Sequence, residues 1–576
     1  MDLTQAEQSL VEKAAAGAER DYSIGDAEQD DPAQGASWDA TRTVRAEVLR
    51  RLCLGLEPKW PVDPRGVRIR GAKIAGDLDL DSATIAFPLE IVRCYVAGAF
   101  VLRDARSKRL VFSGSWLSKG LKAPGVTVEG DVYLSHGFSA KGEVRLPAAD
   151  IGGNLDCSNG TFRNPDGHAL FADGMTVKGG VFLREGFNAK GQVRLLGAEI
   201  GGALDCTKGS FEKQNGYALN ADGIIVKGGV FLREGFSAAG EVSLLGAEIG
   251  GNLECTKCTF KNPSGNALST AGVSVKGSVF LRQGFNAKGQ VRLLGAKING
   301  SLICRSARFD GAQRSVDPDD ALAFSLEAGR VIGVFSWRDV ETTGKVKLGH
   351  ARVGGLWDRR GSWPKPGALE LNGFEYDEFA FDAPTSAAAR KDWLKRQEPF
   401  LPQPYEQAIR VLRRMGHDRD AREIAIAKQV ALRESGRLTR WGRTWNHILE
   451  ITVSYGYEPW RALRWAIAFW LLGITLFDAG FRDGLMSPAD SRVFLHEAFI
   501  FGGSWLPPDY PRFIAPLYSL DVFLPIVDLH QESRWLPNMR NGWGWALWGY
   551  MWFHIAAGWV LTSVFVAALT GLIKKD

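Results

Sequence analysis

The chain has 576 residues, of which 45% are hydrophobic and 23% are charged, a composition typical of globular proteins with more than one domain. Its 70 basic and 65 acidic side chains leave a formal charge of only +5, which excludes the concentrated positive field of a nucleic-acid-binding protein. Glycine crowds the middle of the chain, and 12 of the 19 tryptophans follow residue 440. The sequence therefore contains at least two different physical environments.

Residues 1–60 are predicted to form a helical cap. The N-terminal segment MDLTQAEQSLVEKAAAG includes acidic side chains and no apolar core, so it lacks the pattern of a signal peptide. A helix that begins at Ser37, as its N-cap, places several apolar residues on one face: Val44, Val48, Leu49 and Leu52. We expect this helix to cover the first coil of the repeats that follow.

A repeated pattern fills residues 128–304. Four copies, such as VFLREGFNAKGQVRL, begin 49 residues apart at Val132, Val181, Val230 and Val279. A degenerate copy begins at Val334. A fixed period of this length is typical of a solenoid.

Each 49-residue repeat divides into two similar halves, one slightly longer than the other, because GMTVKGGVFL (174–183) aligns with GAEIGGALDC (197–206). Each half contains short alternating apolar segments broken by Gly, Asn-Gly and Asn-Pro, which suits short strands and leaves no room for helices. We therefore predict a mainly β fold over residues 61–383, a right-handed parallel β-helix with about 24 residues per coil. Similar segments on either side of the regular repeats bring the expected total to about 11 or 12 coils.

Four of the seven cysteines recur at the 49-residue period: Cys157, Cys206, Cys255 and Cys304. In the intervening coils the equivalent residue is leucine, for example Leu183, so we expect these cysteines to fill inward-facing apolar positions. Successive cysteines lie two coils or about 9.6 Å apart, whereas a disulfide needs Cα atoms within about 7 Å. The sequence therefore predicts no disulfide, and the CxxC formed with Cys258 is interpreted as a chance substitution.

Two lines of basic residues mark a candidate docking face for a protein or an anionic partner. One line repeats a lysine and the other an arginine: Lys178, Lys227 and Lys276, and Arg145, Arg194 and Arg292. Acidic neighbours such as Glu199 and Glu248 interrupt this field, so a solvated surface is the alternative. No nucleotide-binding or HExxH motif is present, and we predict no catalytic residue, cofactor site or metal site.

Residues 384–458 are predicted to form a helical neck. Pro404 opens a helix that Gly416 ends, and its apolar residues are Tyr405, Ile409 and Leu412. A second helix follows, with Ala421, Ile424 and Ala425 on its apolar face. This hairpin is similar to a single tetratricopeptide unit, or it simply connects the solenoid to the rest of the chain.

Residues 459–576 are predicted to form a membrane domain. From Trp543 to Ile573, 31 consecutive residues lack Asp, Glu, Lys and Arg, and a spanning helix needs about 20. We predict spans at about 462–481 and 549–573, joined by a loop over 482–542. Arginines before the first span, with Lys574 and Lys575 after the second, favour a cytoplasmic location for both ends.

The loop between the predicted spans contains the apolar stretch RFIAPLYSLDVFLPIVDLHQE (512–532), which Asp521, Asp528 and two prolines interrupt. Irregular backbone at membrane depth is tolerated only where it is buried in protein or lines water. The segment therefore either rests at the interface or re-enters the membrane. In the second case Asp521 and Asp528 are expected at a cation pathway, and His554 in the last span is a candidate pH-sensitive group.

Several segments together resemble a family of bacterial repeat proteins. They are RTVRAEVLRRLCLG, WPVDPRGVRIRGAKIAGDLDL, the VRLLGAEIGGNLDC-type repeats, PQPYEQAIRVLRRMGHDRDAREIAIAKQ and YSLDVFLPIVDL. Members of this family are described as pentapeptide-repeat-like or as "membrane-associated oxidoreductase". The resemblance covers nearly the whole chain and implies membrane association, and it implies an oxidoreductase only through that name.

The leading hypothesis is a non-enzymatic, membrane-anchored β-helical scaffold or sensor without a cofactor. Its expected partners are membrane lipid, a protein bound to the solenoid and other copies of the chain, and not nucleic acid. We expect it in the bacterial inner membrane, with the solenoid and both termini in the cytoplasm. The alternatives are a small cation channel or pore subunit gated by the solenoid, and a membrane-associated oxidoreductase.

Overall fold

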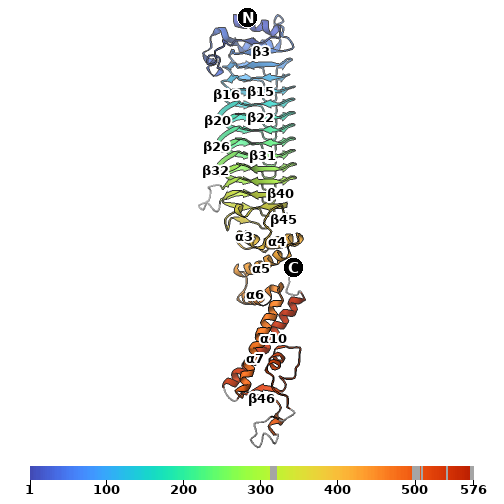
Figure 1. Ribbon diagram of the computed structural model, residues 1–576. Helices are drawn as coiled ribbons and strands as arrows, with labels where there is room; N and C mark the ends of the chain where they lie inside the picture. Colours follow the sequence, from blue (N-terminus) through green and yellow to red (C-terminus); the bar gives the residue numbers. More distant parts are fainter. Residues whose placement is uncertain (312–320, 496–505, 507–509, 540–541, 571–576) are drawn as a thin grey trace. The chain divides into compact units, whose positions relative to one another are not determined.

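The computed structural model describes residues 1–311, 321–495, 506, 510–539 and 542–570 (Figure 1). The chain divides into two compact units, residues 1–420 and 421–576. The first unit contains a parallel β-solenoid of about 13 turns, which confirms the predicted fold class. The second unit is mainly helical.

Each turn of the solenoid contributes strands to two parallel sheets, which within the described residues contain 25 and 20 strands. One regular repeat gives the first sheet β21 (Thr176–Val177), β22 (Val181–Phe182), β24 (Glu199–Ile200) and β25 (Leu204–Asp205). It gives the second sheet β23 (Asn188–Arg194) and β26 (Ser210–Asn220). Each strand pairs in parallel with the strand one turn away, as the stacked arrows of Figure 1 show.

The two halves of the repeat differ by a bulge in the second sheet. Val181 pairs with Leu204, and Leu204 pairs with Val230. The number of residues between paired positions is therefore smaller for one turn and larger for the next. In β20 (Thr161–Phe171), Arg163 pairs with Lys190, but the next pair is His168 with Gln192, so three extra residues are accommodated between them. The predicted division into unequal halves is therefore confirmed, and the three extra residues lie within Asn-Pro-Asp-Gly at 164–167.

The solenoid has one or two more turns than the 11 or 12 that the sequence indicated. An unrecognised turn contains β11 (Leu110–Val111), which pairs with β7 (Leu89–Val92) on one side and with β15 (Val132–Tyr133) on the other. Each of these two turns contains fewer residues than either turn of a regular repeat. Because this turn lacks the motif of the regular repeats, its sequence does not reveal it.

The interior of the solenoid is mainly apolar in the regular repeats. Six apolar residues of one repeat are at most 1% exposed: Val181, Leu183, Val193, Leu195, Ile200 and Leu204. A ladder of phenylalanines with ring centroids 5.1–5.5 Å apart runs through the same interior: Phe138, Phe162, Phe187, Phe211, Phe236, Phe260, Phe285 and Phe309. These contacts combine apolar burial with aromatic packing.

The periodic cysteines occupy the predicted leucine positions. Cys255 pairs in register with Leu281, and Leu281 pairs with Cys304 on the next turn. All seven cysteines are buried and free. Burial raises the pKa of the Cys157, Cys206 and Cys304 thiols well above its usual range, so these side chains are apolar filling and not reactive thiolates.

The N-terminal cap differs from its prediction. It consists of α1 (Gln5–Ala15), β1 (Arg20–Asp21), η1 (Pro32–Ser37), η2 (Ala40–Arg42), β2 (Thr43–Arg45) and α2 (Ala46–Leu54). The expected helix from Ser37 is wrong, because residues 43–45 form a strand that pairs with β4 (Lys73–Ala75) at the open edge of the second sheet. Val48, Leu49 and Leu52 are still buried on the shorter α2, as expected.

The last turns of the solenoid contain β43 (Arg352–Asp358), β44 (Leu369–Glu370) and β45 (Glu375–Phe379), and helices α3 (Ala387–Leu394) and α4 (Pro402–Arg414) follow them. Glutamine side chains satisfy backbone groups of this edge. Gln397 accepts from the Leu371 amide at 2.8 Å, and Gln407 donates to the Tyr376 carbonyl at 2.7 Å. A sheet edge covered in this way cannot pair with another chain.

Both helices of the predicted neck hairpin are present, with a small change in the first. Its first helix, α4, begins at Pro402 instead of Pro404, and Gly416 follows it with a φ of 82°. The second helix is α5 (Asp418–Glu434), in which Ala421, Ile424 and Ala425 are buried. The sequence missed α3, whose Arg390 is fully buried and makes a bidentate ion pair with Asp358 at 2.7 and 2.8 Å.

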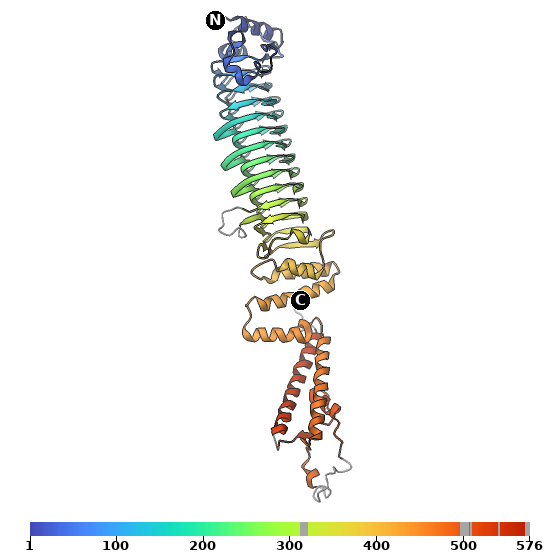
Figure 2. The same ribbon diagram turned by 60° about the vertical axis from the view of Figure 1, so that its left-hand side comes forward.

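The second unit contains α6 (Arg440–Val453), η5 (Ser454–Gly456), α7 (Trp460–Arg482), β46 (Met486–Pro488), η6 (Ser491–Leu495), α9 (Ala515–Phe523), β47 (Trp535–Pro537) and α10 (Gly542–Leu569). Helices α7 and α10 are long and apolar enough to cross a membrane. They pack antiparallel (Figure 2): Ala462 lies with Ala568, and a Cβ on Gly480 would contact Leu547.

The two long helices overlap the predicted spans but have different ends. Helix α7 is close to the expected 462–481, but α10 begins at Gly542, seven residues before the expected 549. The tryptophan-rich segment before residue 549 is therefore helical. Residues 571–573 of the predicted second span, with Lys574 and Lys575, lie outside the described residues.

Candidate functional site

The three predicted docking lysines form one regular row on the first sheet. Lys178, Lys227 and Lys276 each follow a strand of this sheet on alternate turns, so they are about 9.6 Å apart. They are exposed, and within the described chain their ammonium groups have no ion-pair or hydrogen-bond partner. On the intervening turns Gly201 and Gly250 leave no room for a side chain, since a Cβ there would lie 2.2 Å from a lysine carbonyl oxygen.

The three predicted docking arginines lie on the second sheet, at the ends of β17 (Val144–Arg145), β23 and β35 (Asn286–Arg292). Arg194 is ion-paired with Asp173 at 2.7 Å. Three turns with Asn220, Ser243 and Ser269 in register separate it from Arg292. The structure therefore places the six cations on two sheets, with the lysines as the regular row.

Helix α9 packs against the middle of both α7 and α10. A Cβ on Gly558 would lie 1.8 Å from the Phe523 carbonyl oxygen, and one on Gly473 would lie 2.1 Å from Ser519 Oγ. Gly473 is about 20 Å along α7 at 1.5 Å per residue. Glycine is needed at both places because the α9 backbone and side chains approach so closely.

His554 lies at this three-helix contact and is fully buried. Its Nε2 is 3.3 Å from Ser519 Oγ, and its Nδ1 is 3.1 Å from the Tyr550 hydroxyl. Ser519 Oγ donates to the Trp470 carbonyl at 3.0 Å. Sequence reasoning singled out His554 but missed Ser519 and Tyr550, and the glycines within two apolar helices were the available signal.

Asp521 is also on α9, but it faces the loop that follows the helix. Its side chain is 6% exposed and accepts hydrogen bonds from the backbone amides of Leu529, Gln531 and Glu532 at 2.5–2.8 Å. Three amide donors satisfy a buried carboxylate. This carboxylate therefore fixes the return of the chain after α9.

Asp528 lies at the exposed tip of the same loop. It contacts His530 Nδ1 at 2.7 Å and accepts from the His530 amide at 2.8 Å, and these bonds lower the pKa of Asp528. Burial, together with the charges of Asp521 and Asp528, raises the pKa of Glu532. No described contact joins Asp528 to His554, so the three predicted loop residues occupy separate places.

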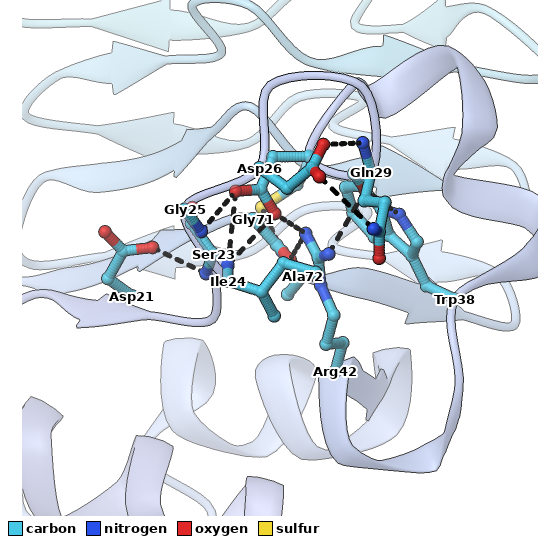
Figure 3. Close-up of polar contacts among 12 residues, drawn as sticks. Asp21, Ser23, Ile24, Gly25, Asp26, Gln29, Trp38, Arg42, Gly71 and Ala72 are labelled. Atoms are coloured by element: carbon cyan, nitrogen blue, oxygen red, sulfur yellow. Dashed lines mark hydrogen bonds and ion pairs between the residues drawn. The ribbon is translucent and has the colours of Figure 1, made fainter.

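A pocket of about 650 Å³ lies in the N-terminal cap, with Trp38, Arg42 and Gln29 among its lining residues. Arg42 pairs with Asp30 at 2.9 Å, and its guanidinium carbon lies 3.8 Å from the centre of the Trp38 ring. It also donates to the Gly71 carbonyl at 3.0 and 3.1 Å, as Figure 3 shows. These contacts join the cap to the first turn of the solenoid, so the cluster has a structural role.

A second pocket, of about 700 Å³, lies in the helical unit between α6 and the start of α7. Three arginines line it: Arg433, Arg461 and Arg464. Sequence reasoning used Arg461 and Arg464 only as signals of membrane topology. It did not bring them together with Arg433 and His447, which the fold of α5 and α6 places at the same pocket.

Within the described residues, no group of three or more His, Cys, Asp or Glu side chains is arranged to hold a metal ion. Comparison with known proteins adds no assignment: no family model, no curated protein and no solved structure matches this chain. The resemblance to bacterial repeat proteins therefore stays a prediction. The arguments below rest on the geometry of the chain itself.

Proposed function

We propose that the chain is a membrane-anchored scaffold in which α7 and α10 cross a membrane and the β-solenoid binds a protein partner. One observation carries this proposal: the two helices expose large apolar side chains, while His554 of α10 is fully buried. At least 44% of each of the following side chains is exposed: Trp460, Trp465, Ile467, Leu471, Leu472, Trp545, Trp552, Phe553, Trp559, Val560 and Val566. Such a surface is unfavourable in water and favourable in lipid.

The charges around the helices support one orientation in the membrane. Because α7 and α10 are antiparallel, Arg461 and Arg464 lie at the same end of the pair as the C-terminal end of α10. Further arginines precede α7: Arg437, Arg440 and Arg443. An excess of arginine favours the cytoplasmic side, which supports a location in the bacterial inner membrane with the solenoid and both flanking ends in the cytoplasm.

The row of Lys178, Lys227 and Lys276 supports a protein partner on the solenoid. A parallel β-solenoid holds these unpaired ammonium groups at fixed intervals of about 9.6 Å, a spacing that an acidic surface of matching regularity would recognise. Self-association through the exposed aromatic side chains of α7 and α10 would make the assembly a homo-oligomer. We propose no cofactor and no nucleic acid for this scaffold.

Carbonate extraction of membranes that contain the full chain tests the anchoring. The wild-type chain should stay in the membrane fraction. The double variant Leu472→Arg with Trp559→Arg should be lost from it, because an arginine at the middle of a span costs about 2.5–3.5 kcal/mol. Leu245→Arg, at an exposed leucine of the solenoid, is the matched control and should behave as the wild type. Release of the wild-type chain by carbonate contradicts the proposal.

A second candidate function is a cation channel, and the position of α9 favours it. Once α7 and α10 span a membrane, α9 is a re-entrant element that reaches the middle of the pair, as the Phe523–Gly558 contact indicates. Reconstituted protein should then conduct cations, and Asp528→Asn with Asp521→Asn should lower the cation preference. If the bilayers show no conductance at any voltage, the channel is rejected and only the scaffold proposal remains.

A further inference from the structure

The pocket between α6 and α7 contains more positive than negative charge. Glu450 pairs with Arg433, and Glu458 pairs with Arg461. Arg464 is exposed and has no partner among the described residues. The pocket therefore contains one guanidinium that no side chain neutralises, next to two others that are each balanced by a single carboxylate.

The two helices that form this pocket, α6 and α7, also carry four exposed tryptophans, of which Trp465 lines the pocket. Trp441 and Trp445, one turn apart on α6, are 85% and 51% exposed. Trp460 and Trp465, at the start of α7, are 67% and 44% exposed. Tryptophan side chains at this density, beside arginines and at the end of an apolar helix, are typical of the boundary between water and lipid.

We infer that this pocket binds the phosphate headgroup of an anionic phospholipid, with Arg464 as the main contact. The inference rests on the proposed function, since it needs α7 to be in a membrane. A guanidinium binds phosphate oxygens with charge-assisted hydrogen bonds. Trp465 also lines the pocket and continues onto the exposed apolar face of α7, so an acyl chain attached to the phosphate has a surface to follow.

Binding to the purified full chain in neutral detergent tests the inference. The probes are dioctanoyl phosphatidylglycerol, dioctanoyl phosphatidylcholine and inorganic phosphate, and the readout is an apparent dissociation constant from ligand-induced stabilisation. Phosphatidylglycerol should bind most tightly. Arg464→Gln should weaken it about fivefold, the effect of one arginine near an anionic lipid surface, and Arg464→Lys should retain most of the binding.

Arg482→Gln is the matched control, because Arg482 is at the opposite end of the same helix. It should leave the affinity for phosphatidylglycerol unchanged. Equal affinity for the two lipids, or equal losses in Arg464→Gln and Arg482→Gln, overturns the inference. Inorganic phosphate that binds as tightly as phosphatidylglycerol assigns the pocket to a free anion and also overturns it.

Carbonate extraction separates this inference from the proposed function. Membrane retention of the wild-type chain together with equal binding of both lipids rejects the lipid site alone. Carbonate release of the wild-type chain rejects the membrane anchor, whatever the lipid titration shows. Arg464→Gln should stay in the membrane fraction and melt like the wild type without added lipid, since Arg464 has no described partner to lose.

Discussion

The solenoid and the helical unit are opposite in what they bury. In the regular repeats of the solenoid the interior contains Leu, Val, Phe and Cys, and most charged side chains lie at the surface. In the helical unit the polar side chains of His554, Ser519 and Asp521 are buried, while tryptophan and leucine side chains are exposed. The comparison shows that one chain is adapted to two solvents, because each region places toward its surroundings the groups that those surroundings solvate.

The two regions also differ in how they tolerate a buried charge. The regular repeats contain none at their inward positions, whereas the end of the solenoid buries Arg390 against Asp358 and the helical unit buries Asp521 against three amides. A buried charge is stable only where partners replace water. The predictions below test this distinction, from the largest expected effect to the smallest.

Cys206→Asp should cause the largest loss of stability. Its side chain would point into the apolar interior with no partner, and neutralising it requires a pKa shift that corresponds to about 4–7 kcal/mol. Cys206→Leu should cost less than about 1.5 kcal/mol, because leucine already occupies this position in alternate turns. Chemical unfolding of the full chain in detergent, followed by the β-sheet circular dichroism signal, measures both. Equal losses would contradict the apolar role of the cysteine.

Asp358→Ala should lower the unfolding free energy by about 3–5 kcal/mol, because it leaves the fully buried Arg390 without its carboxylate. The double variant Asp358→Leu with Arg390→Met should recover part of this loss, since it removes both charges. The same unfolding measurement applies. If Asp358→Ala is as stable as the double variant, the buried Arg390 does not need the carboxylate of Asp358, which would contradict the prediction.

Gly558→Ala should destabilise the helical unit by about 1–3 kcal/mol, because its Cβ would lie 1.8 Å from the Phe523 carbonyl oxygen. Gly549→Ala is the matched control on the same helix, since nothing lies within 4 Å of its Cβ. The melting temperature in detergent should fall only for the first variant. A similar melting temperature for both variants would show that α9 does not pack on α10.

The sequence predicted the solenoid well because its constraint is repeated. Each inward position recurs on many turns. The sequence alone therefore shows the inward leucine positions, the cysteines that replace some of these leucines, and the alternation of a shorter and a longer half-repeat. The turn at β11 was missed because it lacks the motif, and the helix at Ser37 was wrong because an open sheet edge favoured a strand at Thr43. At such an edge, pairing with a neighbouring strand outweighs the helical preference of the local sequence.

The sites of the helical unit depend on contacts that occur once, so no repeated sequence pattern indicates them. His554 was noticed because an ionisable residue in a span is rare, but its partner Ser519 lies 35 residues away in the sequence. Asp521 was predicted to be at a cation pathway, and its hydrogen bonds to the following loop depend on the turn after α9. The arginines of the α6–α7 pocket were visible individually, and only the fold groups them.

Glu7→Gln should produce the smallest effect, a loss of pH dependence at the N-terminal cap. Burial alone would raise the pKa of Glu7, but hydrogen bonds from Arg45 and from the Thr4 and Arg45 amides outweigh it and lower the pKa to about 2 from an unfolded value of 4.5. A carboxyl with a lowered folded pKa stabilises the protein above pH 4.5, and this contribution is lost as the pH falls toward 2. We expect this contribution to the unfolding free energy to be about 1–2 kcal/mol, since the partly exposed Arg45 is screened by solvent.

The unfolding free energy, measured between pH 6 and 3 to bracket ~4.5, should depend less on pH for Glu7→Gln than for the wild type. The exposed Glu12→Gln on the same helix should retain the wild-type slope.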